Sequence, residues 1–164
     1  MLSLADLAAA KLTDGEGGLD ERERHQQGRE VILEVWGQEY GGEILDRLSQ
    51  LAPDLERQIA SYIYGDLWTR EGPPDRKTRS LITVAALTAL HRPNQLRVHL
   101  VGALNNGATE QEIVETILQV GLLAGFPTSW DGLIACRQVF QEYREGRFRQ
   151  PEQTADATAR SFGA

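Results

Sequence analysis

The sequence is poor in the residues that build covalently linked or metal-held structures. It has one cysteine, Cys136, and three histidines among 164 residues. A lone cysteine excludes an intrachain disulfide, a Cys-x-x-Cys redox pair and a cysteine-based zinc site. His25 and His91 have no partner at metal-ligand spacing, so we expect no metal site. A chain of this length buries roughly 70% of the surface that its unfolded form exposes. We therefore expect one domain held by an apolar core.

Long apolar runs and a surplus of basic residues are also missing. No run approaches the ~20 apolar residues that span a bilayer. The segment from Leu2 to Ala10 contains Asp6 and no leading basic cluster, unlike a secretory signal. The 17 Lys and Arg residues against 24 Asp and Glu give a formal net charge of −7, which disfavours phosphate binding. We expect a cytoplasmic protein that binds neither nucleic acid nor a membrane.

The apolar residues that are present recur at helical spacing, without sustained two-residue alternation. We therefore predict an all-α domain of about six helices over residues 19–147, with flexible tails at 1–18 and 148–164. The expected helices span residues 20–36, 53–68, 75–90, 93–106, 110–124 and 129–143. Thr109 and Glu112 form a capping-box pattern at one helix start, and Asp75 is a candidate N-cap at another. The 80–90 stretch is apolar or small nearly all round, which predicts a helix packed on every side.

His99 is the most informative polar residue. Helical spacing places Gln95, Gly102, Ala103 and Asn106 on its side of the helix. The glycine leaves room beside the imidazole for a small molecule, and an ordinary histidine pKa near 6.5 suits proton transfer. An alternative that the spacing leaves equally open is a structural histidine bound to a neighbouring carbonyl.

For Arg79, and for the pair Tyr64 and Trp68, the sequence allows both a functional and a structural interpretation. Arg79, near the start of the 75–90 helix, can hold a substrate carboxylate in a bidentate fork, or pair with Asp75 one turn earlier. Tyr64 and Trp68, four residues apart, can wall a pocket or simply pack in the core. For Cys136, a buried and inert thiol is the favoured state.

Four separated stretches, in order, resemble the carboxymuconolactone decarboxylase family over roughly residues 28–142. They are Tyr64–Arg70, Lys77–Thr83, His99–Gly107 and Gly125–Pro127. The family is similar in fold to the alkylhydroperoxidase-D group. This resemblance implies an all-α architecture, assembly into a homo-oligomer, trimer or hexamer, and a place in the catabolism of aromatic compounds.

The resemblance also separates two branches of that fold. The peroxidase branch uses a glutamate, a Cys-x-x-Cys pair and a histidine, and His99 matches the histidine. The cysteine positions are Arg92 and Gln95 here, and the glutamate position is Ser80. Disulfide-linked peroxide reduction therefore has no nucleophile, whereas the decarboxylase branch retains the histidine and the Asn-Asn-Gly turn.

The implied reaction is a cofactor-independent decarboxylation of a small carboxylated lactone. Loss of CO2 leaves a dienolate whose charge must be stabilised by hydrogen-bond donors, and the lactone itself is the electron sink, so no cofactor is needed. We assign His99 as general acid or oxyanion donor and Arg79 as carboxylate clamp. The expected substrate-binding residues are Tyr64, Trp68, Asn105, Asn106 and Trp130.

Two alternatives belong to other classes of function. One is a non-catalytic oligomer that uses the same scaffold to bind a ligand or a partner protein. The other is a redox enzyme that uses Cys136 alone, which lacks a resolving thiol. The segment 123–132, with Phe126 and Trp130, departs from the decarboxylases proper and leaves the substrate less defined than the scaffold.

Overall fold

The computed structural model describes residues 19–148, and within that range the chain folds as helices joined by short connections. The all-α expectation is confirmed. The predicted flexible tails at 1–18 and 148–164 lie outside the described residues, except for Phe148. The helices are, in order, α2 (Glu21–Trp36), α3 (Gln38–Leu51), α4 (Pro53–Gln58), the π-helix η1 (Ile59–Leu67), α5 (Arg76–Ala89), α6 (Pro93–Asn105), α7 (Glu110–Ala124) and α8 (Phe126–Arg144).

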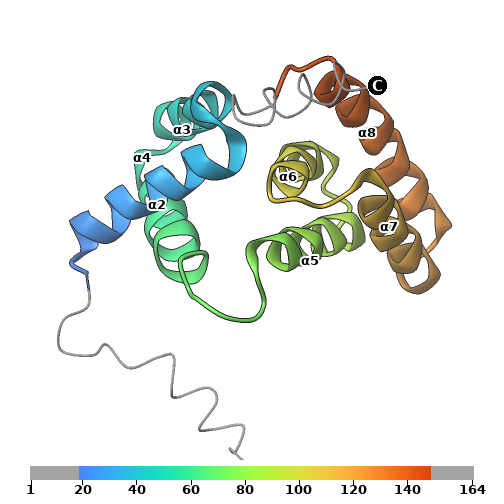
Figure 1. Cartoon of the computed structure of the whole chain (residues 1–164), viewed down its shortest axis with the longest axis horizontal. Helices are drawn as coiled ribbons and strands as arrows, with labels where there is room; N and C mark the ends of the chain where they lie inside the picture. Colours follow the sequence, from blue (N-terminus) through green and yellow to red (C-terminus); the bar gives the residue numbers. More distant parts are fainter. Residues whose placement is uncertain (1–18, 149–164) are drawn as a thin grey trace, which may run out of the picture.

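The helices form two groups that meet along α2 and α6 (Figure 1). In one group, α2 packs chiefly against η1, with α3 and α4 beside them. In the other, α5 packs on α6 and α7, and α8 covers α6 and α7. The connection 68–75 leads from the first group to the second (Figure 1). Any pocket at the α2–α6 contact is therefore lined from both groups.

Glycines allow α2 and η1 to approach until their backbones touch. A Cβ atom on Gly28 would lie 1.8 Å from the carbonyl oxygen of Ala60, and one on Gly65 would lie 2.1 Å from that of Arg24. Neither distance is compatible with a side chain, so this contact requires glycine on both helices. The close approach fixes η1, and with it Tyr64, against the core face of α2.

A buried carboxylate also joins the first group. Glu56 at the end of α4 is 5% exposed. Its carboxylate oxygens accept from Arg29 at 2.6 Å and lie 3.0 Å from Nε2 of His25. Both partners belong to α2, so α4 is tied to α2 by charge as well as by apolar contact.

Two predicted helix starts are confirmed. The hydroxyl of Thr109 accepts from the backbone N–H of Glu112 at 3.1 Å, and the Glu112 carboxylate accepts from that of Thr109 at 2.8 Å. Asp75 accepts from the N–H of Thr78 at 2.7 Å and begins α5. Local capping signals in the sequence were sufficient here, because all the partners lie within one helical turn.

One helix was not predicted, and one prediction about another helix was wrong. The helix α3 was not expected, because Gly37, Gly41 and Gly42 weaken its start, although it buries Gly41 and Leu45. The prediction that the 80–90 helix is packed on every side also fails within this chain. Only Ser80, Val84 and Thr88 of α5 are buried, and Ile82 is 56% exposed.

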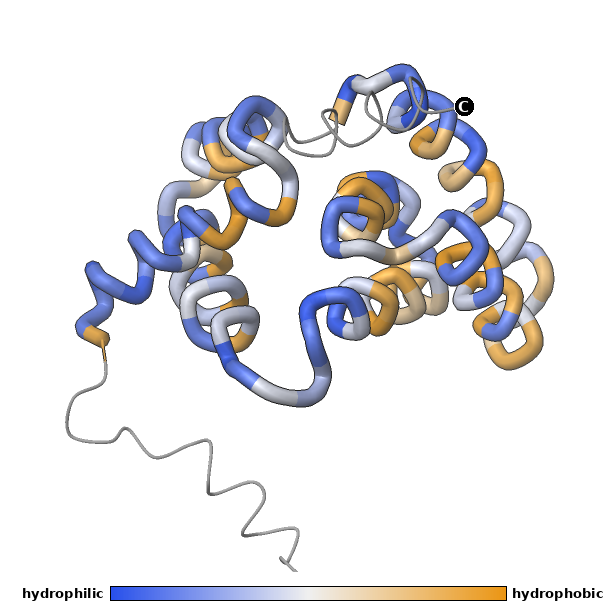
Figure 2. The backbone as a smooth tube through the Cα atoms, in the orientation of Figure 1, coloured by the Kyte–Doolittle hydropathy of each residue, from blue (hydrophilic) through white to orange (hydrophobic). Residues whose placement is uncertain are grey.

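Large apolar side chains also remain exposed on α7 and α8. They are Leu118, Leu122, Leu123, Phe126, Trp130 and Ile134. Figure 2 shows orange, hydrophobic stretches of the backbone along these two helices. In the described part of the chain, no helix has the length and apolar character to cross a membrane. Phe148 was predicted to begin the C-terminal tail, but its side chain is buried. Its ring packs on that of Tyr40, with the two ring centroids 4.8 Å apart.

Candidate functional site

A cavity of about 180 Å³ lies where α2, α3 and η1 meet α6. Most of its lining is aliphatic or aromatic, and the residues are Ile32, Trp36, Ile44, Leu48, Ile59, Tyr64, Gln95, Val98 and His99. This volume is below the roughly 300–1,000 Å³ of drug-sized sites, so the cavity suits a small molecule. Its side chains come from both helix groups.

His99 is half-buried and faces this cavity. Its ring nitrogens have no hydrogen-bond partner among residues 19–148, which contradicts the alternative of a structural histidine bound to a carbonyl. Burial lowers the pKa of His99 from 6.5 to about 4. The imidazole is therefore neutral near pH 7, with one N–H to donate and one nitrogen to accept.

Trp36, at the end of α2, fixes the position of His99. Its Nε1–H donates to the carbonyl oxygen of Val98 at 2.9 Å, directly before His99 in α6. The indole meets the imidazole edge to face, with ring centroids 5.6 Å apart and planes at 78°. The indole of Trp36 lines the cavity. Because its Nε1–H already donates to Val98, Trp36 has no N–H left to donate to a ligand.

The expectation that Gly102 leaves room for a ligand is wrong. A Cβ atom on Gly102 would lie 3.1 Å from Nε1 of Trp36 and 3.0 Å from Cγ1 of Val35. The space beside this glycine is thus filled by α2. Gly102 serves the site indirectly, because it lets the indole reach the backbone of α6.

Tyr64 of η1 lines the same cavity and is 4% exposed. Its ring packs edge to face on Trp36 and against Trp68, with centroids 5.3 Å apart in each case. Trp68 is buried and does not line the cavity; it supports Tyr64 from behind. Burial raises the pKa of Tyr64 above its ordinary value of 10.0.

Arg79 is half-buried on α5 and does not line the cavity. The pairing with Asp75 does not form, because that carboxylate caps the helix instead, and no carboxylate among residues 19–148 pairs with the Arg79 guanidinium. Arg76, three residues earlier, pairs with Glu34 of α2 at 2.7 Å. Since residues three apart share a helix face, the side of α5 that carries Arg79 is turned toward α2.

The two asparagines hold helices together. The Asn105 amide donates to the carbonyl oxygen of Val35 at 2.9 Å and accepts from the Tyr143 hydroxyl at 3.0 Å, which links α6 to α2 and α8. Asn106 donates to the hydroxyl of Ser80 at 3.0 Å, which links α6 to α5. Neither lines the cavity.

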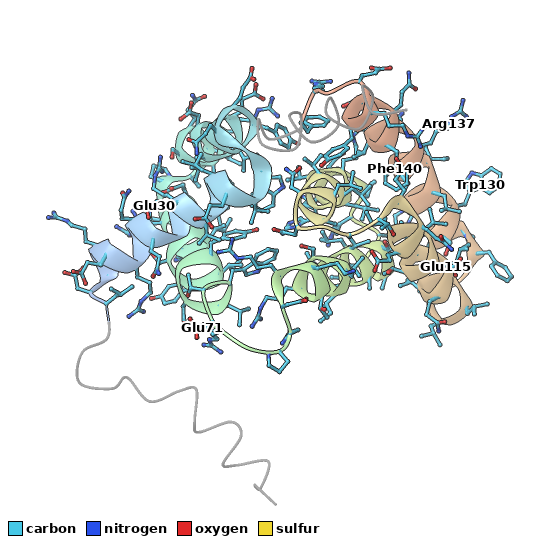
Figure 3. All side chains as sticks on the ribbon, viewed as in Figure 1. Glu30, Glu71, Glu115, Trp130, Arg137 and Phe140 are labelled. Atoms are coloured by element: carbon cyan, nitrogen blue, oxygen red, sulfur yellow. The ribbon has the colours of Figure 1, made fainter. Side chains whose placement is uncertain are left out.

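Trp130 lies far from this arrangement. It is 70% exposed and projects from the outer side of α8, away from α6 (Figure 3). Of the residues expected at the site, the structure brings together His99 and Tyr64 around one cavity, with Trp68 behind them. Arg79 lies on α5 outside the cavity lining, and Trp130 projects from the outer side of α8.

Comparisons with known proteins agree with this scaffold. The sequence profile described as "Carboxymuconolactone decarboxylase family" matches residues 53–138. A 4-carboxymuconolactone decarboxylase of Acinetobacter baylyi is 38% identical over 124 residues, which cover 76% of this chain and 92% of the relative. The chain belongs to the carboxymuconolactone decarboxylase family.

A second relative that is named as a decarboxylase is less similar to this chain. A nitrosuccinic acid decarboxylase of Metarhizium robertsii is 30% identical over 132 residues, or 80% of this chain and 92% of the relative. An uncharacterized 15.0 kDa protein of Paracoccus denitrificans is 37% identical over 101 residues, 60% of this chain and 74% of the relative. Membership of the carboxymuconolactone decarboxylase family supports a decarboxylase-like function.

Gln95 and Cys136 are the residues that bear on the redox alternatives. Gln95, at one of the peroxidase cysteine positions, lines the cavity beside His99. Cys136 is buried in α8, and burial raises its thiol pKa to about 12, so the reactive thiolate is scarce. Among residues 19–148, no three His, Cys, Asp or Glu side chains gather as metal ligands.

Sequence reasoning missed several lining residues. Trp36 was read only as a helix end, and Ile44 and Leu48 lie on the unexpected helix α3. The four-residue spacing of Ile44 and Leu48 is an amphipathic signal that indicates this helix. Nothing local pairs Trp36 with Val98, which is 62 residues away.

Proposed function

We propose that this protein is a cofactor-independent, carboxymuconolactone decarboxylase-like lyase that acts on a small carboxylated lactone. The observation that carries the proposal is the neutral, unpartnered imidazole of His99 facing a small and largely apolar cavity. An apolar setting favours loss of a carboxylate as CO2, because a charged group is costly to keep there. A fixed donor in the same setting stabilises the anion that forms.

The reaction follows from the electron flow. The bond between the ring carbon and the carboxylate breaks, CO2 leaves, and the electron pair delocalises onto the lactone carbonyl oxygen. The N–H of His99 donates to that oxygen as its charge develops, without giving up the proton. The carbon then takes a proton that is supplied from water. The pKa of about 4 favours the oxyanion-donor role over an imidazolium acid near pH 7.

The remaining parts of the proposed site hold the substrate. Arg79 is the candidate clamp for a second carboxylate, since the residue is half-buried and shares a helix face with Arg76, which pairs with Glu34 of α2. Tyr64 and Trp68 form an aromatic wall. The proposal does not use Asn105, Asn106 or Trp130.

The two named decarboxylases suggest what unites their substrates. A carboxylated lactone that loses CO2 leaves its charge on a carbonyl oxygen, and a nitro acid leaves it on the nitro oxygens. Either anion needs a neutral donor in a dry cavity. We therefore expect the substrate of this chain to carry an electron-accepting oxygen group beside the carboxylate that is lost.

The test is ultraviolet monitoring of 4-carboxymuconolactone consumption by purified wild type, His99→Gln and His91→Gln. Removal of an oxyanion donor typically lowers kcat by about 100- to 1,000-fold, and we expect this for His99→Gln. His91 is exposed on the α5–α6 connection. His91→Gln makes the same histidine-to-glutamine replacement outside the cavity, so this control variant should retain wild-type turnover. Full turnover by His99→Gln would remove His99 from the reaction.

A further inference from the structure

The hydroxyl of Tyr64 is a second polar group in the cavity that the reaction above leaves unused. It has no hydrogen-bond partner among residues 19–148, although the side chain is 4% exposed. Among residues 19–148, the fully buried side-chain polar atoms without a partner are Ser61 Oγ and Thr88 Oγ1, so the Tyr64 oxygen is not sealed from solvent. Because Tyr64 lines the cavity, a bound molecule can supply that partner.

The ring of Tyr64 is held rigidly. Trp36 packs on it edge to face at 78°, Trp68 packs on it at 50°, and the glycine contact between α2 and η1 fixes the backbone around it. A donor that is fixed before the reaction costs no reorganisation when charge develops. The hydroxyl thus meets the physical requirement for stabilising an anion.

Tyr64 and His99 share one support. Both rings stand at 78° to the indole of Trp36, with centroids 5.3 and 5.6 Å from it. The same indole is anchored to the backbone of α6 through Val98. One side chain therefore sets the position of both rings that line the cavity.

We propose that the Tyr64 hydroxyl is a catalytic residue that forms, with the His99 N–H, a two-donor oxyanion site. This inference rests on the proposed decarboxylase function. Both groups donate hydrogen bonds to the oxygen that receives the electron pair, and neither transfers its proton. Burial keeps the pKa of Tyr64 high, so the hydroxyl remains a donor throughout the neutral range.

The kinetic test compares Tyr64→Phe with Tyr62→Phe. Each variant loses one oxygen atom, but Tyr62 is 58% exposed on η1 and does not line the cavity. We expect Tyr64→Phe to lower kcat about 100-fold with little change in KM, and Tyr62→Phe to match wild type. Unchanged kcat in a folded Tyr64→Phe, or a rise in KM alone, would overturn the donor role and leave Tyr64 as a wall.

A binding test is independent of turnover. Tetronate is a five-membered lactone that carries a delocalised enolate, and its affinity is measured by calorimetry for wild type and both variants. We expect Tyr64→Phe to weaken binding about tenfold, as for one hydrogen bond to a charged group, and Tyr62→Phe to leave it unchanged. Equal affinities in all three proteins would overturn the inference.

The two tests separate the inference from the proposed function. Wild type that binds tetronate through Tyr64 but consumes no carboxylated lactone supports the donor pair and contradicts the decarboxylase proposal. Turnover that depends on His99 and not on Tyr64 supports the decarboxylase proposal and overturns the donor pair. Circular dichroism establishes that each variant is folded.

Discussion

The lowered pKa of His99 makes the stability of the protein depend on pH in a predictable way. In the unfolded chain a histidine titrates near 6.5, whereas burial beside the cavity lowers the pKa of His99 to about 4 in the folded chain. As the pH falls below 6.5, the unfolded chain binds a proton that the folded chain does not bind. The folded state therefore loses stability as the pH falls, and this loss is nearly complete at pH 4.

The magnitude follows from the size of the shift. At about 1.36 kcal/mol per pKa unit, His99 lowers the free energy of unfolding by about 3 kcal/mol between pH 7 and pH 4. This is a large share of the roughly 5–15 kcal/mol by which proteins are stable. His99→Gln keeps a polar side chain of similar size and removes the titration.

The assay is urea unfolding followed by tryptophan fluorescence at pH 7, 6, 5 and 4, at one protein concentration. Other groups titrate in this range, so the measured quantity is the difference between wild type and His99→Gln at each pH. We expect wild type to lose about 3 kcal/mol more than the variant from pH 7 to pH 4. Parallel pH dependence of the two proteins would show that the imidazole is solvated or paired, and the reasoning from burial would fail.

Three glycine substitutions, of which Gly42→Ala is the control, test the packing that builds the site. Gly28→Ala places a methyl group 1.8 Å from the carbonyl oxygen of Ala60, so thermal unfolding should show a loss of several kcal/mol, while Gly42→Ala, with open space around it, should change stability by less than about 1 kcal/mol. Gly102→Ala presses on Trp36 at 3.1 Å, so it should lower kcat more than it raises KM, and an unchanged kcat would contradict the role given to the indole.

The sequence was sufficient wherever the decisive partners are close together in the chain. The capping box of Thr109 and Glu112 and the N-cap Asp75 predicted helix starts that the structure has. The side of α6 that carries His99 and Gln95 was also predicted, since helical spacing fixes it, and both line the cavity.

Interactions between distant segments were not predictable in this way. Within helix α6 alone, Gly102 leaves open space beside it. In the folded protein this space is filled by Trp36, which lies 66 positions earlier in the sequence. The Asn105 amide was expected to face a substrate, but its partner is the carbonyl of Val35, 70 residues away. Such contacts depend on how α2 crosses α6, which no local spacing encodes.

The pH dependence of kcat/KM for 4-carboxymuconolactone tests the central claim most directly, namely that a neutral His99 acts as a hydrogen-bond donor in the cavity. With a pKa of about 4, the imidazole remains neutral from pH 5 to pH 8, so the account predicts a flat profile in that range. The His99→Gln profile should run parallel and lower. A wild-type rate that falls about tenfold per pH unit across this range would show that the imidazolium is the active form and would contradict the account.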